Sequence, residues 1–166
     1  TSSLVGSEMC IRDRGKIITT RLTADLLDIM LQDSAHIQEQ DAEYQNRKNK
    51  RAGRPEVEPI YTVADALRVR EFIQTCEYGE EVPVVEGVTA RFIDAGHLLG
   101  SASIKLTCHE GDETRTVVFS GDIGNVDQPI IRDPQFFDSA DYVLTESTYG
   151  DRNHTEVWSY TGQLAE

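Results

Sequence analysis

The sequence lacks the features that define several common classes of protein. Its three cysteines, Cys10, Cys76 and Cys108, are far apart and form no Cys-x-x-Cys pair, so neither a zinc ribbon nor a disulfide framework is indicated. Cys108 falls on the apolar side of an expected strand, which predicts a buried thiol. No apolar run approaches the ~20 residues that cross a bilayer, and no segment resembles a signal peptide. We therefore expect a cytoplasmic protein with no membrane partner.

Positive charge is also scarce. The 166 residues include 16 Lys and Arg against 29 Asp and Glu, which gives a net charge of −13. Such a chain repels nucleic acid at long range, so any contact with nucleic acid needs a local basic patch or bound metal ions. The charge argues against a stand-alone nucleic-acid-binding module. It does not argue against a metallonuclease, whose acidic residues hold the metals that meet phosphate.

The first half of the chain predicts two helices. From about residue 22 to residue 51, apolar residues recur at helical spacings, and Thr20 or Thr23 can cap the start. The resulting stripe contains Leu22, Leu26, Ile29, Met30, Ile37 and Tyr44, and it is widened by Leu27, Leu31 and Ala35. A second helix is expected from residue 62, where TVAD is typical of a capping box. His36 lies in the middle of the long helix and is interpreted as a partly exposed helix residue.

The long helix ends in a basic cluster, residues 47–54, which contains Arg47, Lys48, Lys50, Arg51 and Arg54. These side chains could contact an RNA backbone, with an affinity that depends on salt. Alternatively, they form a solvated helix end that complements the helix dipole. The sequence alone favours the second interpretation.

The second half of the chain predicts strands. After residue 79 apolar and polar residues alternate, which predicts strands near 88–92, 102–109 and 116–119, with a turn at 110–113 and a last strand at 142–145. Helices followed by an antiparallel run, each with one apolar face, predict an α/β layered sandwich with helices outside the sheets.

Two residues stand where metal ligands are often found. His97 and Asp122 each follow an expected strand beside glycine, and the hairpin between them would bring both to the same sheet edge. Imidazole nitrogen and carboxylate oxygen suit zinc, and a carboxylate can bridge paired metals that hydrolyse a phosphodiester. Taken singly, His97 could instead be a hydrogen-bonded core histidine, and Asp122 a turn residue.

Three motifs that follow one another along the chain favour the metal-ligand interpretation of both residues. They are DAGHLLGS at residues 94–101, FSGDIG at 119–124 and ESTYGDR at 146–152. Together, over residues from about Gly15 to the C-terminus, they resemble the β-CASP branch of the metallo-β-lactamase superfamily, zinc-dependent hydrolases that cut RNA or DNA. The resemblance implies a metallo-β-lactamase-like αββα four-layer sandwich, incomplete in this chain. Residues 15–155 would be a partial metallo-β-lactamase domain, and residues 156–166 the start of a truncated β-CASP cap domain.

The resemblance also assigns roles to residues. His97 corresponds to a ligand of the second zinc, and Asp122 to the carboxylate that bridges both zinc ions. Glu146 corresponds to a carboxylate that supports the site. His154 either faces the substrate cleft or is a surface histidine in a loop. Asp94 could orient its neighbours, but it ranks below the others because aspartate is common in such turns.

The His-x-His-x-Asp-His run that supplies most ligands in this family does not occur in the sequence. Residues 1–14 occupy its place, show no periodicity and are expected to be a non-native leader; a flexible native tail is the alternative. With two ligands, the chain itself is expected to bind zinc weakly and to lack nuclease activity.

The function expected of the intact protein is zinc-dependent hydrolysis of phosphodiester bonds in single-stranded RNA, with two zinc ions. The alternatives are a catalytically dead scaffold or binding subunit, and a small-molecule metallohydrolase. The choices between RNA and DNA and between endonuclease and exonuclease stay open. The oligomeric state also stays open, with a homodimer as one alternative.

Overall fold

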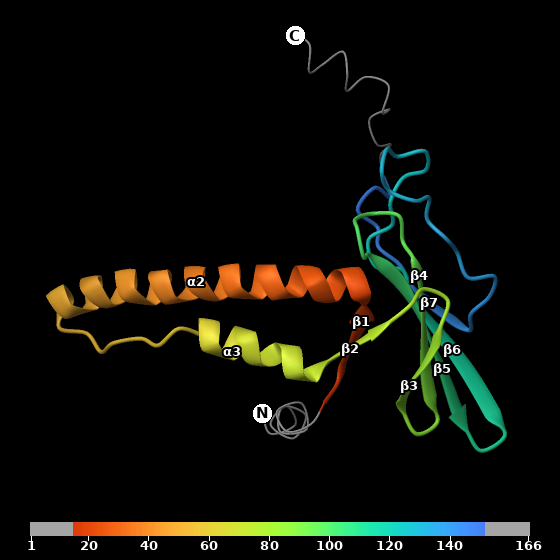
Figure 1. The fold of residues 1–166 in the computed structure, drawn as a ribbon, viewed down its shortest axis with the longest axis horizontal. Helices are drawn as coiled ribbons and strands as arrows, with labels where there is room; N and C mark the ends of the chain where they lie inside the picture. The colour runs from red at the N-terminus through yellow and green to blue at the C-terminus, as the bar shows by residue number, and fades with distance from the viewer. Residues whose placement is uncertain (1–14, 152–166) are drawn as a thin grey trace, which may run out of the picture. The chain divides into compact units, whose positions relative to one another are not determined.

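The computed structural model describes residues 15–151, and the chain divides between Cys76 and Glu77 into two compact units (Figure 1). The first unit holds two helices and a parallel strand pair, and the second holds a mixed sheet. The fold class is therefore α/β, as predicted. The expected domain boundaries at residues 14 and 155, and the candidate residue His154, lie outside the described residues. No helix in the described range is long and apolar enough to cross a membrane.

The first unit is built around one long helix. Strand β1 (Ile17–Thr20) leads directly into α2 (Arg21–Ala52), and a loop returns through α3 (Val63–Arg68) and the 3-10 turn η1 (Val69–Phe72) to β2 (Ile73–Cys76). Strand β2 pairs in parallel with β1, and α3 packs along α2 (Figure 1). The Thr20 hydroxyl caps α2 by accepting a hydrogen bond from the backbone N–H of Thr23 at 3.3 Å. The helix ends at Gly53, whose φ of 65° is the left-handed conformation that favours glycine.

The buried face of α2 shares only Ala35 with the predicted stripe. The buried residues are Ala35, Ala42 and Asn49, spaced by seven, whereas Ile29 and Met30 are 68% and 64% exposed. Small residues on the buried face let α3 and its connecting loop approach the helix, and the Tyr61 hydroxyl donates to Ser34 Oγ there at 2.6 Å. The length of the helix was predicted correctly, but its covered face was predicted only in part.

The short helix α3 begins with the predicted capping box. The Thr62 hydroxyl accepts from the Asp65 backbone N–H at 3.2 Å, and the Asp65 carboxylate accepts from the Thr62 backbone N–H at 3.0 Å. Hydrogen bonds from Thr62 lower the pKa of the Asp65 carboxyl below its usual value. Each partner satisfies a backbone donor that the helix itself leaves unpaired.

The second unit contains a five-stranded sheet in the order β3-β4-β5-β6-β7. Its strands are β3 (Glu81–Val85), β4 (Val88–Asp94), β5 (Ala102–Glu110), β6 (Glu113–Phe119) and β7 (Tyr142–Leu144). The first four are antiparallel neighbours, as predicted for β4 to β6, but β7 runs parallel to β6. Strands β1, β2 and β3 were not predicted. Strand β3 is an edge strand whose Pro83 interrupts the usual strand pattern.

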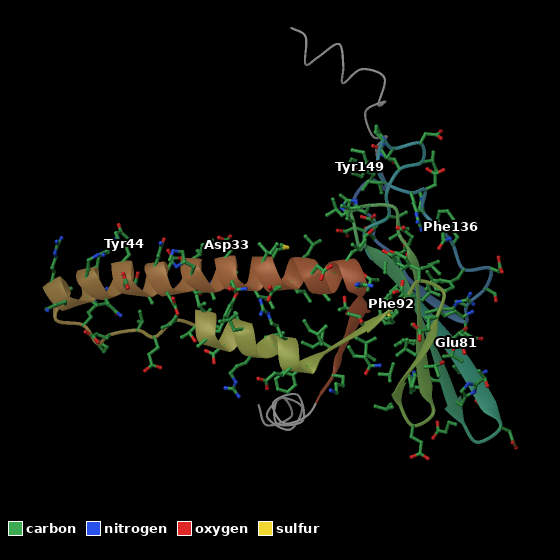
Figure 2. All side chains as sticks on the ribbon, in the orientation of Figure 1. Asp33, Tyr44, Glu81, Phe92, Phe136 and Tyr149 are labelled. Atoms are coloured by element: carbon green, nitrogen blue, oxygen red, sulfur yellow. The ribbon has the colours of Figure 1, made fainter. Side chains whose placement is uncertain are left out.

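The core of the second unit is small. Its buried apolar residues are Val82, Ala90, Phe92, Ile93, Ala95 and Val118, and Phe92 is labelled in Figure 2. Ser103 is buried as well, and its hydroxyl donates to the Ser120 carbonyl at 2.7 Å. Cys108 is half-buried rather than buried, because it sits toward the far end of β5 near the hairpin turn. Neither unit alone, within the described residues, contains four layers, so the sandwich stays a prediction.

Candidate functional site

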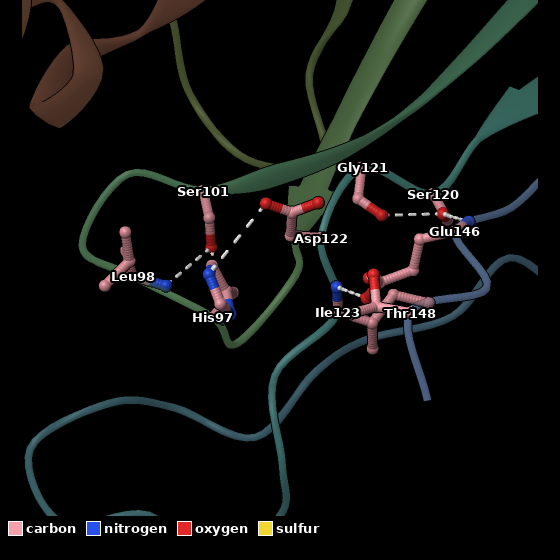
Figure 3. Close-up of polar contacts among 9 residues, drawn as sticks. All are labelled: His97, Leu98, Ser101, Ser120, Gly121, Asp122, Ile123, Glu146 and Thr148. Carbon is pink, nitrogen blue, oxygen red and sulfur yellow. Dashed lines mark hydrogen bonds and ion pairs between the residues drawn. The ribbon is translucent and has the colours of Figure 1, made fainter. Parts of the chain in front are cut away.

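Three loops at one end of the sheet carry the candidate residues. His97 lies between β4 and β5, Asp122 follows β6, and Glu146 follows β7. The strand register brings these loops to the same end of the sheet, because β4, β5, β6 and β7 are successive neighbours in it. His97 Nε2 lies 4.0 Å from Asp122 Oδ2, so the hairpin brings the two predicted ligands together (Figure 3). His97, Asp122 and Glu146 line the same open pocket.

The His97 loop is held by two side chains that flank it. The Ser101 hydroxyl accepts hydrogen bonds from the backbone N–H groups of His97 and Leu98, both at 3.2 Å. The Asp94 carboxylate accepts from the Gly96 backbone N–H at 2.9 Å. Asp94 therefore shapes the turn that carries His97, which is the orienting role considered for it from the sequence.

The His97 and Asp122 loops meet at two glycines. The Gly124 backbone N–H donates to the Ala95 carbonyl at 2.8 Å. A Cβ at Gly124 would overlap the Gly96 carbonyl oxygen, so no other residue fits this approach without moving a backbone. Gly96 itself has a φ of 65°. Glycine at both positions thus sets the separation of His97 and Asp122.

Glu146 ties the third loop to the second. One carboxylate oxygen accepts from the Ile123 backbone N–H at 2.7 Å, and the other accepts from the Thr148 hydroxyl at 3.0 Å (Figure 3). The Ile123 hydrogen bond, followed by that of Thr148, lowers the pKa of the Glu146 carboxyl, and His97 contributes a smaller effect. The Glu146 backbone N–H donates to Ser120 Oγ at 3.0 Å. Glu146 is therefore a positioning residue for the segment beside Asp122.

The donor set fits one metal ion incompletely. Two zinc bonds of about 2.0–2.1 Å that meet at a tetrahedral angle place their donor atoms about 3.4 Å apart. His97 Nε2 and Asp122 Oδ2 are 4.0 Å apart and both solvent-accessible, so these side chains would have to move slightly closer to share an ion. Tetrahedral zinc needs further donors, yet residues 15–151 contain no group of three or more His, Cys, Asp or Glu side chains that could hold a metal. His97 and Asp122 therefore supply only two of the donors that a bound ion needs.

The other candidate histidine in the described range takes no part in this site. His36 lies on α2 and makes a hydrogen bond with Gln40 at 2.8 Å. Sequence reasoning missed the roles of the Ser101, Ser120 and Thr148 hydroxyls. The available signal was their place inside the three motifs, beside His97, Asp122 and Glu146.

Known proteins resemble this chain over most of its length. Ribonuclease TTHA0252 of Thermus thermophilus is 33% identical over 141 residues, which are 85% of this chain and 27% of that protein. The RNase J-like protein of Methanocaldococcus jannaschii is 29% identical over 81% of this chain and 27% of its own length. The transcription termination factor FttA of Thermococcus kodakarensis is 28% identical over 86% of this chain and 20% of its own length. No protein-family model matches the chain.

His97 and Asp122 approach each other in a pocket that Glu146 also lines, and Glu146 holds the backbone beside Asp122. With its three motifs and these relatives, the chain belongs to the β-CASP branch of the metallo-β-lactamase superfamily, the family that the sequence predicted. It spans about a quarter of the length of the curated relatives that it matches.

Proposed function

We propose that this chain is part of a metal-dependent hydrolase that cleaves phosphodiester bonds in RNA. The observation that carries the proposal is the approach of His97 to Asp122, 4.0 Å apart in an open pocket. The names of the relatives, which include a ribonuclease and an RNase J-like protein, support RNA as the substrate class. The substrate is single-stranded RNA, because an extended strand can enter an open, loop-lined site.

Each residue of the site has a part in this function. His97 and Asp122 would hold zinc, which supplies a Lewis acid and lowers the pKa of water to near neutral. Asp94 and Ser101 fix the backbone beside His97, and Glu146 fixes the backbone beside Asp122. The remaining ligands, and the other layers of the αββα sandwich, would come from the rest of the protein.

The metal also reconciles the charge of the chain with its proposed substrate. With a net charge of −13, the chain repels a polyanion at long range. Bound divalent cations invert the local potential at the carboxylates that hold them, so the phosphate of RNA is attracted where the bond is cleaved.

The test uses the complete protein encoded at the source locus, which is sequenced upstream of Gly15 and downstream of Glu166 to obtain its full reading frame. Cleavage of an end-labelled single-stranded RNA is compared between the wild type and His97→Ala, Asp122→Asn and His109→Ala variants. The first two variants should lose at least about 100-fold in rate. His109→Ala is the matched control, because this histidine is exposed on β5 and makes a hydrogen bond with Thr114 instead.

Three results would contradict the proposal. If His97→Ala cleaves RNA as fast as the wild type, the assigned site is wrong. If the wild type hydrolyses small esters or lactones but no RNA, the small-molecule interpretation replaces the nuclease. A complete protein that binds no zinc and cleaves nothing would favour the scaffold interpretation.

A further inference from the structure

Charge is segregated along helix α2. Residues 22–43 contain six acidic residues and no Lys or Arg: Asp25, Asp28, Asp33, Glu39, Asp41 and Glu43. Residues 44–54 contain five basic residues and no acidic one: Arg47, Lys48, Lys50, Arg51 and Arg54. In a chain with only 16 basic residues, this concentration is a local exception to the acidic surface.

Four residues at this end of α2 share one face of the helix. Tyr44, Arg47, Lys48 and Arg51 follow the spacing of three, four and seven that places side chains together. Tyr44 comes two residues after the buried Ala42, and Arg51 comes two residues after the buried Asn49. Two residues correspond to about 200° around the helix, so both side chains lie away from the buried face. We call these four residues the basic strip; Tyr44 is labelled in Figure 2.

The opposite face of the helix end is clamped by the loop that follows it. The Asn46 side chain accepts from the Val57 backbone N–H at 2.7 Å and donates to the Val57 carbonyl at 2.8 Å. The Asn49 side chain donates to the Pro55 carbonyl at 2.9 Å. The loop is thus tied to the face away from the basic strip, which leaves the strip uncovered on a fixed helix end.

The basic strip is exposed and has no acidic partner. Its three cations are exposed, and within residues 15–151 none of them forms an ion pair. Lys48 Nζ lies 4.3 Å and Arg47 Cζ 5.9 Å from the centre of the Tyr44 ring. The helix dipole does not account for Arg47 and Lys48, because its effect fades beyond the last turn, where Lys50 and Arg51 stand.

We propose that the basic strip is an RNA-contact surface that binds the backbone of single-stranded RNA and stacks one base on Tyr44. From Tyr44 to Arg51 the strip extends about 10 Å along the helix, and each of its three cations can meet one phosphate of a strand laid along it. Proteins that bind single-stranded nucleic acid combine cations, which contact the backbone, with exposed aromatic rings, on which bases stack. The choice of RNA as the partner rests on the proposed function. The conclusion that the strip is an exposed basic surface rests on the contacts described above.

The test measures binding of a fluorescein-labelled 20-nucleotide oligouridine to the 166-residue chain by anisotropy, in EDTA so that no cleavage occurs. Three phosphate contacts predict that log K falls with log salt with a slope of about −2. The Arg47→Gln/Lys48→Gln/Arg51→Gln variant should bring the slope close to zero. Tyr44→Ala should weaken binding about tenfold with the slope unchanged, since stacking releases no counterions.

The matched control is Lys16→Gln/Arg68→Gln/Arg91→Gln, which removes the same charge from exposed positions elsewhere. It should keep the slope of the wild type. Helical circular dichroism verifies folding, because glutamine is a good helix former. If the two triple variants bind RNA equally, net charge alone governs binding and the proposal is wrong. If polyglutamate binds the strip and oligouridine does not, the partner is an acidic protein and the proposal is again wrong.

The assay separates this proposal from the proposed function. Oligouridine binding is measured in EDTA, because the strip acts without metal. If the strip of the complete protein binds RNA but the protein cleaves none, the proposed nuclease function is wrong and the RNA-contact surface stands. If the complete protein cleaves RNA but its strip binds none, the RNA-contact surface is wrong and the nuclease function stands.

Discussion

At the scale of single residues, the candidate site depends on backbone proximity more than on charge. Neither His97 nor Asp122 is buried, and their 4.0 Å separation follows from how closely their loops approach. That approach is possible because Gly124 has no side chain where the Gly96 carbonyl passes. The most informative substitution in the site is therefore at a glycine that carries no functional group.

Gly124→Ala should separate the two loops. The added methyl group cannot fit beside the Gly96 carbonyl, so the backbone must shift, at a cost of about 1–3 kcal/mol. Amide NMR signals of residues 95–98 and 122–124 should move, and thermal unfolding should begin earlier. Gly111→Ala is the control: it strains a left-handed turn where a Cβ meets nothing, so its signal changes should stay near the hairpin. Unchanged signals at residues 95–98 in Gly124→Ala would contradict this account.

At the scale of elements, the parallel strand β7 needs an anchor that the sequence did not reveal. The Asp141 carboxylate, just before β7, accepts from the Thr116 backbone N–H at 2.7 Å and from the Thr116 hydroxyl at 2.8 Å. These hydrogen bonds lower the pKa of the Asp141 carboxyl below its usual value. The ionised carboxylate therefore fixes where β7 starts against β6.

Asp141→Asn should make the second unit less stable in a pH-dependent way. Because the folded pKa is depressed, this stabilisation is present above the unfolded pKa of about 4 and is lost as pH falls through the lower folded pKa. The difference in unfolding midpoint between wild type and variant should be constant near neutral pH and shrink below about pH 4. Asp138→Asn, an exposed neighbour in the same loop, is the control. A difference that grows in acid would exclude this role for Asp141.

How much of each element was predictable follows from its pattern. Strands β4, β5 and β6 alternate apolar and polar residues, and α2 repeats with helical spacing, so both were found. Strands β1 and β2 have four residues each, too few to show a period. The direction of β7 depends on the path of residues 120–141, which carries no periodicity. The covered face of α2 was predicted only in part, at Ala35, because another small residue, Ala42, also packs there while larger apolar residues stay exposed.

The site was predictable where it depends on a hairpin, and unpredictable where it depends on individual atoms. A hairpin between the two loops brings His97 and Asp122 to one edge whatever the exact register of its turn. The hydrogen bond from Ile123 to Glu146 instead requires the specific pairing of Phe119 with Leu144, which brings β7 to the end of β6. Sequence motifs identified Glu146, but only the structure shows which backbone group it binds.

At the scale of the whole molecule, a site assembled from separate segments should bind metal only as well as the segments present allow. A structural zinc site with a full set of ligands is worth about 10–16 kcal/mol. Within residues 15–151, His97 and Asp122 approach each other, no group of three or more possible ligands is present, and both side chains are accessible to water. Two ligands on exposed loops cannot supply that free energy.

The 166-residue chain should therefore bind zinc with a dissociation constant weaker than about 1 µM. Competition with a chromophoric chelator measures this value. His97→Ala should weaken the binding further, and His109→Ala, on the far half of β5, should leave it unchanged, which ties the weak binding to the site. Zinc retained in stoichiometric amount after dialysis against EDTA would show that this chain supplies additional ligands. The complete protein should bind zinc far more tightly through the same His97 and Asp122, because each further ligand adds to an ion that these two already hold in position.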